Sequence, residues 1–145
     1  KTNFICLFCF LSLFASAKKK RITPNLSGTY VLAKQLSSGQ LLPVHHIKSK
    51  ISIDQTNKRI ACNVGCNSIS GNFNADKNKI DPLQLISTEM SCGDFLDQLE
   101  TTFVQNLSKI NRYRTAAMIL YLLEGEKILI VFGENSEQAV ALVLY

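Results

Sequence analysis

The sequence has little of the residues that mark fibrous, repetitive or disordered proteins. Its 145 residues include only three Pro and seven Gly, which excludes a collagen-like chain, and no segment recurs as it would in a solenoid or propeller. Charged residues make up 19% and hydrophobic residues 46%, and eight Phe and four Tyr accompany the absence of Trp. This is not the composition of a disordered chain, and a chain of this length can bury one core, so we expect a single domain.

Excess charge is also absent from most of the chain. The net charge is +5, but Lys1 and the basic cluster at residues 18–21 account for all of it. Over residues 22–145 the remaining Lys and Arg are balanced by the 11 Asp and Glu. Because nucleic-acid-binding domains carry their positive charge on the folded part, this distribution argues against a nucleic-acid partner.

No hydrophobic run is long enough to span a bilayer, which requires about 20 residues. An apolar run at residues 4–14 is followed by Ala15-Ser16-Ala17, a combination typical of a secretory signal peptide. We therefore expect a signal over residues 1–17, cleavage after Ala17, and a basic lead-in over residues 18–25. A lipoprotein would need a cysteine where Lys18 stands, and the run is short for an uncleaved anchor.

The pattern of apolar and polar residues predicts many strands and one helix. Strands are expected at residues 27–35, 50–54, 59–64, 72–75, 80–87, 118–123, 127–132 and 139–145, with a weaker candidate at 113–117. Between Gly65 and Gly71 we expect an irregular crossing or a bulge. One apolar stripe predicts a helix after Gly93, with the residues Leu96, Leu99, Phe103, Leu107 and Ile110. The pattern predicts an α+β fold, with a small, mostly antiparallel sheet curled toward a barrel.

Few residues are placed for catalysis or metal binding. A zinc site or a Cys–His nucleophile would draw on Cys62, Cys66, Cys92, His45 and His46. In an extended strand, however, Cys62 and Cys66 would lie about 13 Å apart, and no local signature supports an activated thiol. Acidic residues such as Asp94, Asp97 and Glu100 are ordinary in the first turns of a helix. No phosphate-binding loop, serine-hydrolase elbow or zinc-protease motif is present, so we expect no catalytic residue, metal or cofactor.

Several motifs in the same order resemble the META domain family, which includes the HslJ-like bacterial heat-shock proteins. Gly65-Cys66-Asn67 with Gly71 and Phe73 is similar to the family's Gly-Cys-Asn-x-x-x-Gly-x-aromatic signature. The stretch with Thr88, Met90 and Cys92 is similar to its Thr-x-Met-x-Cys motif, and Glu100 matches the helix that follows. The likeness covers residues 26–133 and leaves residues 134–145 as a C-terminal extension, in which we expect a last strand.

The resemblance implies a barrel-like α+β domain that is exported and has no established enzymatic activity. Relatives are linked to stress, drug tolerance or virulence. Our interpretation is a secreted or periplasmic, non-enzymatic protein with a stress-response or envelope-related role, whose partner is an envelope protein or an apolar ligand. The alternative is a carrier or pilot-like protein that binds a lipid or another apolar ligand in the barrel mouth.

The two motifs that carry the resemblance each contain a cysteine. We expect Cys66 and Cys92 to form a disulfide, as an oxidising compartment permits. Cys62 and Cys66 are poor partners in an extended strand, because a disulfide needs Cα atoms about 4.4–6.8 Å apart. Cys62 would then be a buried free thiol or an intermolecular linker, and because it shares a strand face with Ile60 we expect it to be buried. A Cys62–Cys92 bridge, or no bridge at all, remains the alternative.

Overall fold

The computed structural model of the chain describes residues 25–44 and 49–144. The expected signal peptide, the basic lead-in up to residue 24, and His45 and His46 lie outside the described residues. The described part contains strands and helices in the order β1 (Gly28–Ser37), β2 (Gln40–Pro43), β3 (Lys50–Asp54), β4 (Arg59–Val64), β5 (Asn67–Asp76), β6 (Lys79–Ser87), α1 (Asp94–Leu107), β7 (Arg112–Ala116), β8 (Ile119–Glu124), β9 (Lys127–Gly133) and α2 (Ser136–Leu144).

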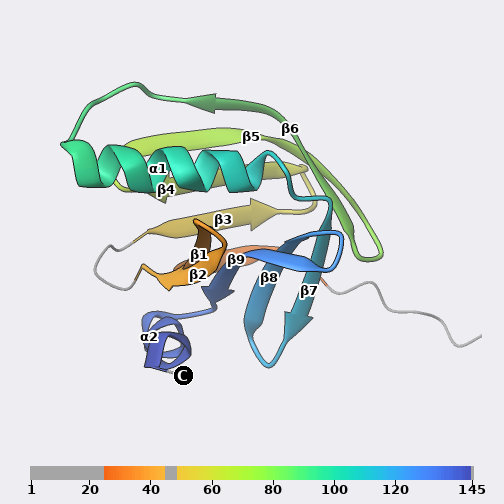
Figure 1. Cartoon of the computed structure of the whole chain (residues 1–145). Coiled ribbons are helices and arrows are strands. Elements are labelled where there is room, and N and C mark those ends of the chain that lie inside the picture. The colour runs from red at the N-terminus through yellow and green to blue at the C-terminus, as the bar shows by residue number, and fades with distance from the viewer. Residues whose placement is uncertain (1–24, 45–48, 145) are drawn as a thin grey trace, which may run out of the picture.

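Eight of these strands close into an antiparallel barrel (Figure 1). From β3 to β9 each strand pairs with the next one along the chain, and β1 closes the barrel by pairing with both β3 and β9. β2 extends the sheet along the second half of β1, where Gln35 pairs with Leu42. The α+β barrel predicted from the sequence is confirmed, and β2 is an addition that its pattern did not predict.

The barrel encloses one packed core. Along β4 the alternation is complete, because Ile60, Cys62 and Val64 are buried while the residues between them are exposed. Inward-facing side chains of the other strands, such as Phe73 and Phe132, belong to the same buried cluster. The hairpin predicted at residues 50–54 and 59–64 is confirmed, since β3 and β4 pair along their whole length.

The segment after β4 is more regular than we expected. β5 begins at Asn67 and continues for 10 residues, so the short strand expected at residues 72–75 is too short. The irregularity is a bulge on β6, where Gln84 and Leu85 lie opposite Gly71 of β5. A Cβ atom on Gly71 would lie 2.8 Å from the Leu83 carbonyl oxygen. Glycine is therefore required at this position, because β6 approaches the β5 backbone too closely for a side chain.

Helix α1 packs on the barrel with the predicted stripe. Phe103 and Leu107 are buried, as is Ile110 just beyond the helix, and all three belong to the core cluster. Leu96 and Leu99 are half-buried nearer the start of the helix. The helix contacts β1, β4 and β9 and runs alongside β4 and β5 in Figure 1. Its second half anchors it in the barrel core.

The C-terminal extension forms a helix, and the last strand that we expected at residues 139–145 is wrong. Helix α2 begins at Ser136, and the Asn135 side chain caps it by accepting a hydrogen bond from the Gln138 N–H (2.9 Å). β1 already occupies the edge of β9 on which another strand would have to pair. α2 therefore packs across β1 and β9 (Figure 1).

The strand candidate at residues 113–117 is confirmed as β7. Its junction with β6 is the weakest in the barrel, because only Lys79 and Arg112 are paired there. This junction is weak where the chain leaves the sheet after β6, forms α1, and returns to the sheet as β7. Within residues 25–44 and 49–144, neither helix has the length and apolar character needed to cross a membrane.

Candidate functional site

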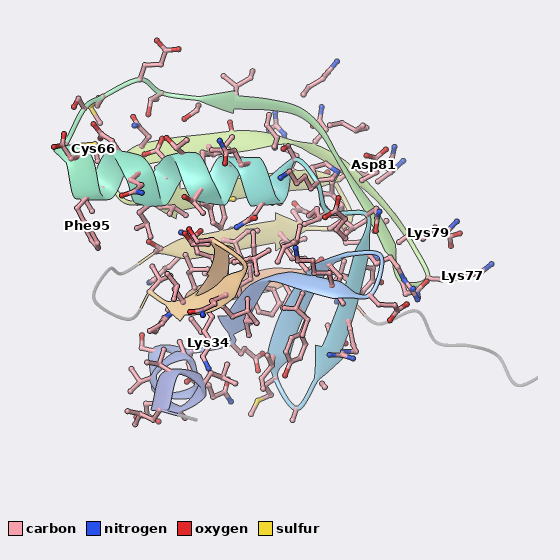
Figure 2. The ribbon with its side chains drawn as sticks, viewed as in Figure 1. Lys34, Cys66, Lys77, Lys79, Asp81 and Phe95 are labelled. Carbon is pink, nitrogen blue, oxygen red and sulfur yellow. A yellow bond between two sulfur atoms is a disulfide. The ribbon has the colours of Figure 1, made fainter. Side chains whose placement is uncertain are left out.

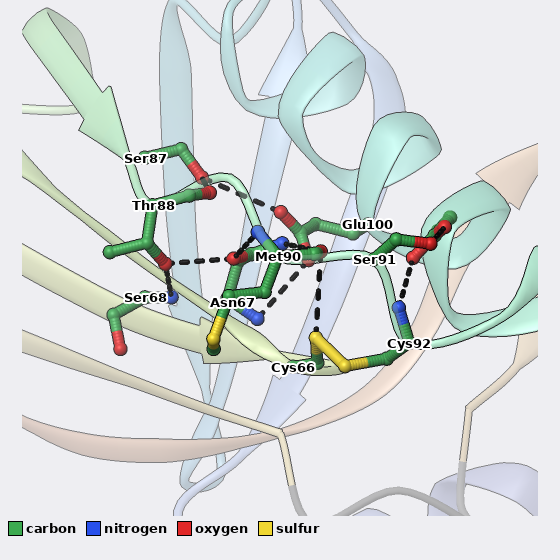
Figure 3. Close-up of a disulfide and its surroundings, with 10 residues drawn as sticks. Cys66, Asn67, Ser68, Ser87, Thr88, Met90, Ser91, Cys92 and Glu100 are labelled. Carbon is green, nitrogen blue, oxygen red and sulfur yellow. Dashed lines mark hydrogen bonds between the residues drawn. A yellow bond between two sulfur atoms is a disulfide. The ribbon is translucent and has the colours of Figure 1, made fainter.

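Most of the motif residues identified in the sequence meet at one end of the barrel, whereas Gly71 lies farther along β5, opposite the bulge on β6. The β4–β5 turn carries Gly65 and Cys66, and the connection from β6 to α1 carries Thr88, Met90 and Cys92. Figure 3 shows these two segments side by side, with Glu100 of α1 reaching them from the helix. Residues separated by more than 20 positions in the sequence are thus brought into one cluster, which we call the motif junction.

The β4–β5 turn positions one half of the disulfide. Val64 and Asn67 are paired across the turn, so only Gly65 and Cys66 form the loop. Gly65 has a φ of 72°, and a two-residue hairpin loop with positive φ at its first position strongly favours glycine there. The turn directs Cys66 toward Cys92, and the disulfide between them joins Cα atoms 6.2 Å apart. The structure thus contains the bridge expected from the sequence, which ties the turn to the start of α1.

Asn67 is the central polar residue of the motif junction. Its side-chain oxygen accepts hydrogen bonds from the Met90 N–H and the Thr88 hydroxyl, both 2.8 Å long. Its amide nitrogen donates to the Met90 carbonyl oxygen at 2.9 Å. Cys66 Sγ lies 3.6 Å from that same oxygen, which is a contact and not a hydrogen bond because a disulfide sulfur carries no hydrogen. Asn67 thus makes three hydrogen bonds to a segment that belongs to no strand or helix.

Glu100 and Asp97 stabilise the motif junction through separate sets of hydrogen bonds. The buried Glu100 carboxylate accepts hydrogen bonds from the Asn67 N–H (3.3 Å) and the Ser87 hydroxyl (3.4 Å). Asp97 accepts from the Cys92 N–H (3.0 Å) and the Ser91 hydroxyl (2.7 Å). The hydrogen bond from the Cys92 N–H, and to a smaller extent that from the Ser91 hydroxyl, holds the pKa of the Asp97 carboxyl below its usual value. The two carboxylates share no partner, because Glu100 bonds the start of β5 and the end of β6, whereas Asp97 bonds the connection from β6 to α1.

The cysteines considered for zinc or thiol chemistry do not come together as one site. Cys66 and Cys92 are bonded to each other, and the Cys62 side chain lies in the barrel core. Burial raises the pKa of the Cys62 thiol to about 12, so the thiol stays protonated and is a weak nucleophile. In the described part of the chain, no group of three or more His, Cys, Asp or Glu side chains is arranged to hold a metal ion.

A hollow of about 270 Å³ lies beside the seam between β6 and β7. It is lined by Lys77, Arg112 and Arg114, but two of these cations already have partners. Arg112 forms an ion pair with Glu126, and Arg114 lies over the Tyr121 ring, 4.8 Å from its centre. Glu126 lines the hollow as well, and Figure 2 shows Lys77 and Lys79 toward the tip of the β5–β6 hairpin with Asp81 farther along β6. The mixed charge at this seam gives no defined site for an anion.

The sequence interpretation missed a larger hollow, of about 420 Å³, between α2 and the barrel wall. Most of its lining is apolar and includes Ile119, Tyr121, Ile128, Val131, Ala141 and Leu142. The sequence did contain a signal, since residues 118–123 and 127–132 are apolar at nearly every position. That pattern is typical of strands covered on both faces and not of strands with one face in water.

Comparison with known proteins identifies the fold. The profile of the META domain family matches residues 24–137. An NMR structure of a protein from Burkholderia xenovorans is 17% identical with a TM-score of 0.63, over 75% of this chain and 82% of that chain. A crystal structure of a DUF4847 family protein from Bacteroides vulgatus is 16% identical with a TM-score of 0.54, over 76% of this chain and 94% of that one. At these identities the likeness shows the fold alone, and among curated proteins none matches the chain.

Proposed function

Because the chain belongs to the META domain family, we propose that it works as an exported, non-enzymatic protein with a role in stress tolerance or in the cell envelope. The observation that carries this proposal is the Cys66–Cys92 disulfide. Disulfides form and persist outside the reducing cytoplasm, so the bridge supports export. The apolar run at residues 4–14 and the Ala15-Ser16-Ala17 site support the same route.

The use of the motif residues supports the non-enzymatic part of the proposal. The side chains of Asn67, Thr88 and Glu100 form hydrogen bonds with each other and with nearby backbone groups. A catalytic site would instead need a polar group free to meet a substrate. Cys62 is held protonated in the core, so it does not supply a nucleophile. The activity of the protein would then be exerted by binding.

Export predicts a defined N-terminus. In protein recovered from the native host, N-terminal sequencing should begin at Lys18, because signal peptidase cleaves after small residues such as Ala15 and Ala17. The same material should be found outside the cytosolic fraction. A soluble cytosolic protein that still begins at Lys1 would contradict the proposal.

The stress-related role predicts a conditional phenotype. Deletion of the gene in the native host should leave growth in rich medium unchanged and lower survival under heat or under an antibiotic that must cross the envelope. Re-expression of the natural chain should restore survival. A variant with Ala17→Glu, which blocks signal cleavage, should not restore it although its folded domain is unaltered. A deletion strain that survives every such challenge as well as its parent would argue against this role.

A second candidate function is a carrier for an apolar ligand. The expected place, the barrel mouth, receives no support, because Phe73, Phe103 and Phe132 fill the interior and are almost fully buried. The observation that favours a carrier is instead the hollow on the outer wall beside α2.

A further inference from the structure

The outer wall of the barrel is apolar where β8 and β9 run together. Ile119, Tyr121 and Ile128 are half-buried there, and Val131 is buried. Helix α2 covers only part of this wall, since its closest packing is at Ala139, which is buried, whereas Ala141 is exposed. An apolar sheet face that the fold covers only in part is expected to have another occupant.

The second half of α2 stands over this wall and completes a groove. Ala141 and Leu142 line it from the helix, and Leu41 of β2 also lines it. Its volume of about 420 Å³ lies within the range of known small-molecule sites, about 300–1,000 Å³. The start of the helix is held in place by Asn135 and by the Gln138 side chain, which accepts a hydrogen bond from the Glu134 N–H. The groove is therefore built into the fold before any ligand binds.

One cation, that of Lys34, lines this apolar groove. Lys34 lies on β1 between Pro43 of β2 and Val131 of β9, and Figure 2 shows its side chain directed toward α2. The side chain is half-buried, and within residues 25–44 and 49–144 no carboxylate pairs with it and no hydrogen bond is made to it. A cation surrounded by apolar side chains is stabilised by an anionic group brought to it.

We propose that this groove binds an amphiphile with one acyl chain and a carboxylate head group, such as a fatty acid. The acyl chain lies along the wall formed by Ile119, Ile128 and Val131, and the carboxylate pairs with the Lys34 ammonium group. The acyl chain then contacts the apolar surface of the groove, and the carboxylate contacts its one positive charge. This proposal gives the carrier function its ligand class and its site, and it does not depend on export.

The proposal predicts how binding depends on the ligand. In calorimetric titrations below the micelle concentration, dodecanoate should bind one molecule per chain, and dodecanol should bind at least about tenfold more weakly. From octanoate upward, each added methylene should raise the affinity about fourfold until the groove is filled. If dodecanoate does not bind, or binds no more tightly than dodecanol, the proposal is wrong.

Variants locate the site. Lys34→Met keeps the apolar stem of the side chain and should lower dodecanoate affinity about tenfold or more while leaving dodecanol affinity unchanged. Ala141→Trp should fill the groove and abolish binding of both ligands. The matched control is Lys109→Met, which removes an exposed lysine outside the groove and should change neither affinity. If Lys109→Met weakens dodecanoate binding as much as Lys34→Met does, the attraction is one of general charge and the site assignment fails.

Two other occupants of the groove are tested in the same way. Sedimentation that reveals a dimer, and a return to monomer with Ala141→Trp, would assign the groove to a second copy of the chain and overturn the proposal. Stable binding to phosphatidylglycerol vesicles in the absence of dodecanoate uptake would assign it to a membrane surface, with the same consequence. Neither result bears on the N-terminus found in the host, so failure here leaves the proposal of an exported, non-enzymatic protein standing.

Discussion

Replacing Phe103 by alanine is expected to lower the free energy of unfolding by about 3–5 kcal/mol. The Phe103 side chain is fully buried, with 0% of its surface exposed, in the cluster that α1 shares with the barrel. Its ring meets that of Phe132 edge to face, with 6.4 Å between the ring centres. Removing the ring leaves a cavity between the helix and β9, which the closed barrel has little freedom to collapse around.

Urea denaturation monitored by circular dichroism measures this loss. The matched control is Phe95→Ala, in the same helix, because Phe95 is 68% exposed and should cost less than about 0.5 kcal/mol. A loss below about 1 kcal/mol for Phe103→Ala would show that α1 does not anchor the core through this face.

Loss of the Cys66–Cys92 bridge is expected to destabilise the protein by about 3–4 kcal/mol. The two cysteines are separated by 26 residues, so the bridge closes a loop that includes β5 and β6. The bridge limits the number of conformations open to the unfolded chain. Without it the unfolded chain gains conformational entropy, and the folded state is less stable relative to it. The exposed connection between β6 and α1 would also lose its only covalent tie to the β4–β5 turn.

The double variant Cys66→Ser/Cys92→Ser measures this effect in the same denaturation experiment. The natural protein treated with a reductant should show a similar loss, and the reductant should leave the variant unchanged, which serves as the control. Without reductant, the unfolded exported protein should present one alkylatable thiol, that of Cys62. A Cys62–Cys92 peptide in a non-reducing digest, or three alkylatable thiols, would contradict the assignment of the bridge.

The parts of the fold that were predicted correctly are those with local signals. In β3 and β4 each inward residue follows the last at a spacing of two, so the burial pattern could be seen in the chain itself. The apolar residues of α1 repeat at helical spacing, and Phe103 and Leu107 are buried in the core as that spacing predicted. The motif residues could be picked out only by their resemblance to a family, because Asn67 and Glu100 meet across 33 positions of sequence.

The sequence by itself therefore determined the barrel class, the main hairpins, the anchoring helix and the cysteines available for a bridge, because each rests on a short repeating pattern or on a recognisable motif. Tertiary structure alone decided the rest. The apolar residues 139–144 suit a strand or a helix, and they became α2 because β1 had taken the edge of β9. The groove beside Lys34 exists only because α2 packs on β1 and β9, next to the apolar outer wall of β8 and β9. Closure of the barrel, which pairs β1 with β9 from the two ends of the domain, placed the helix there.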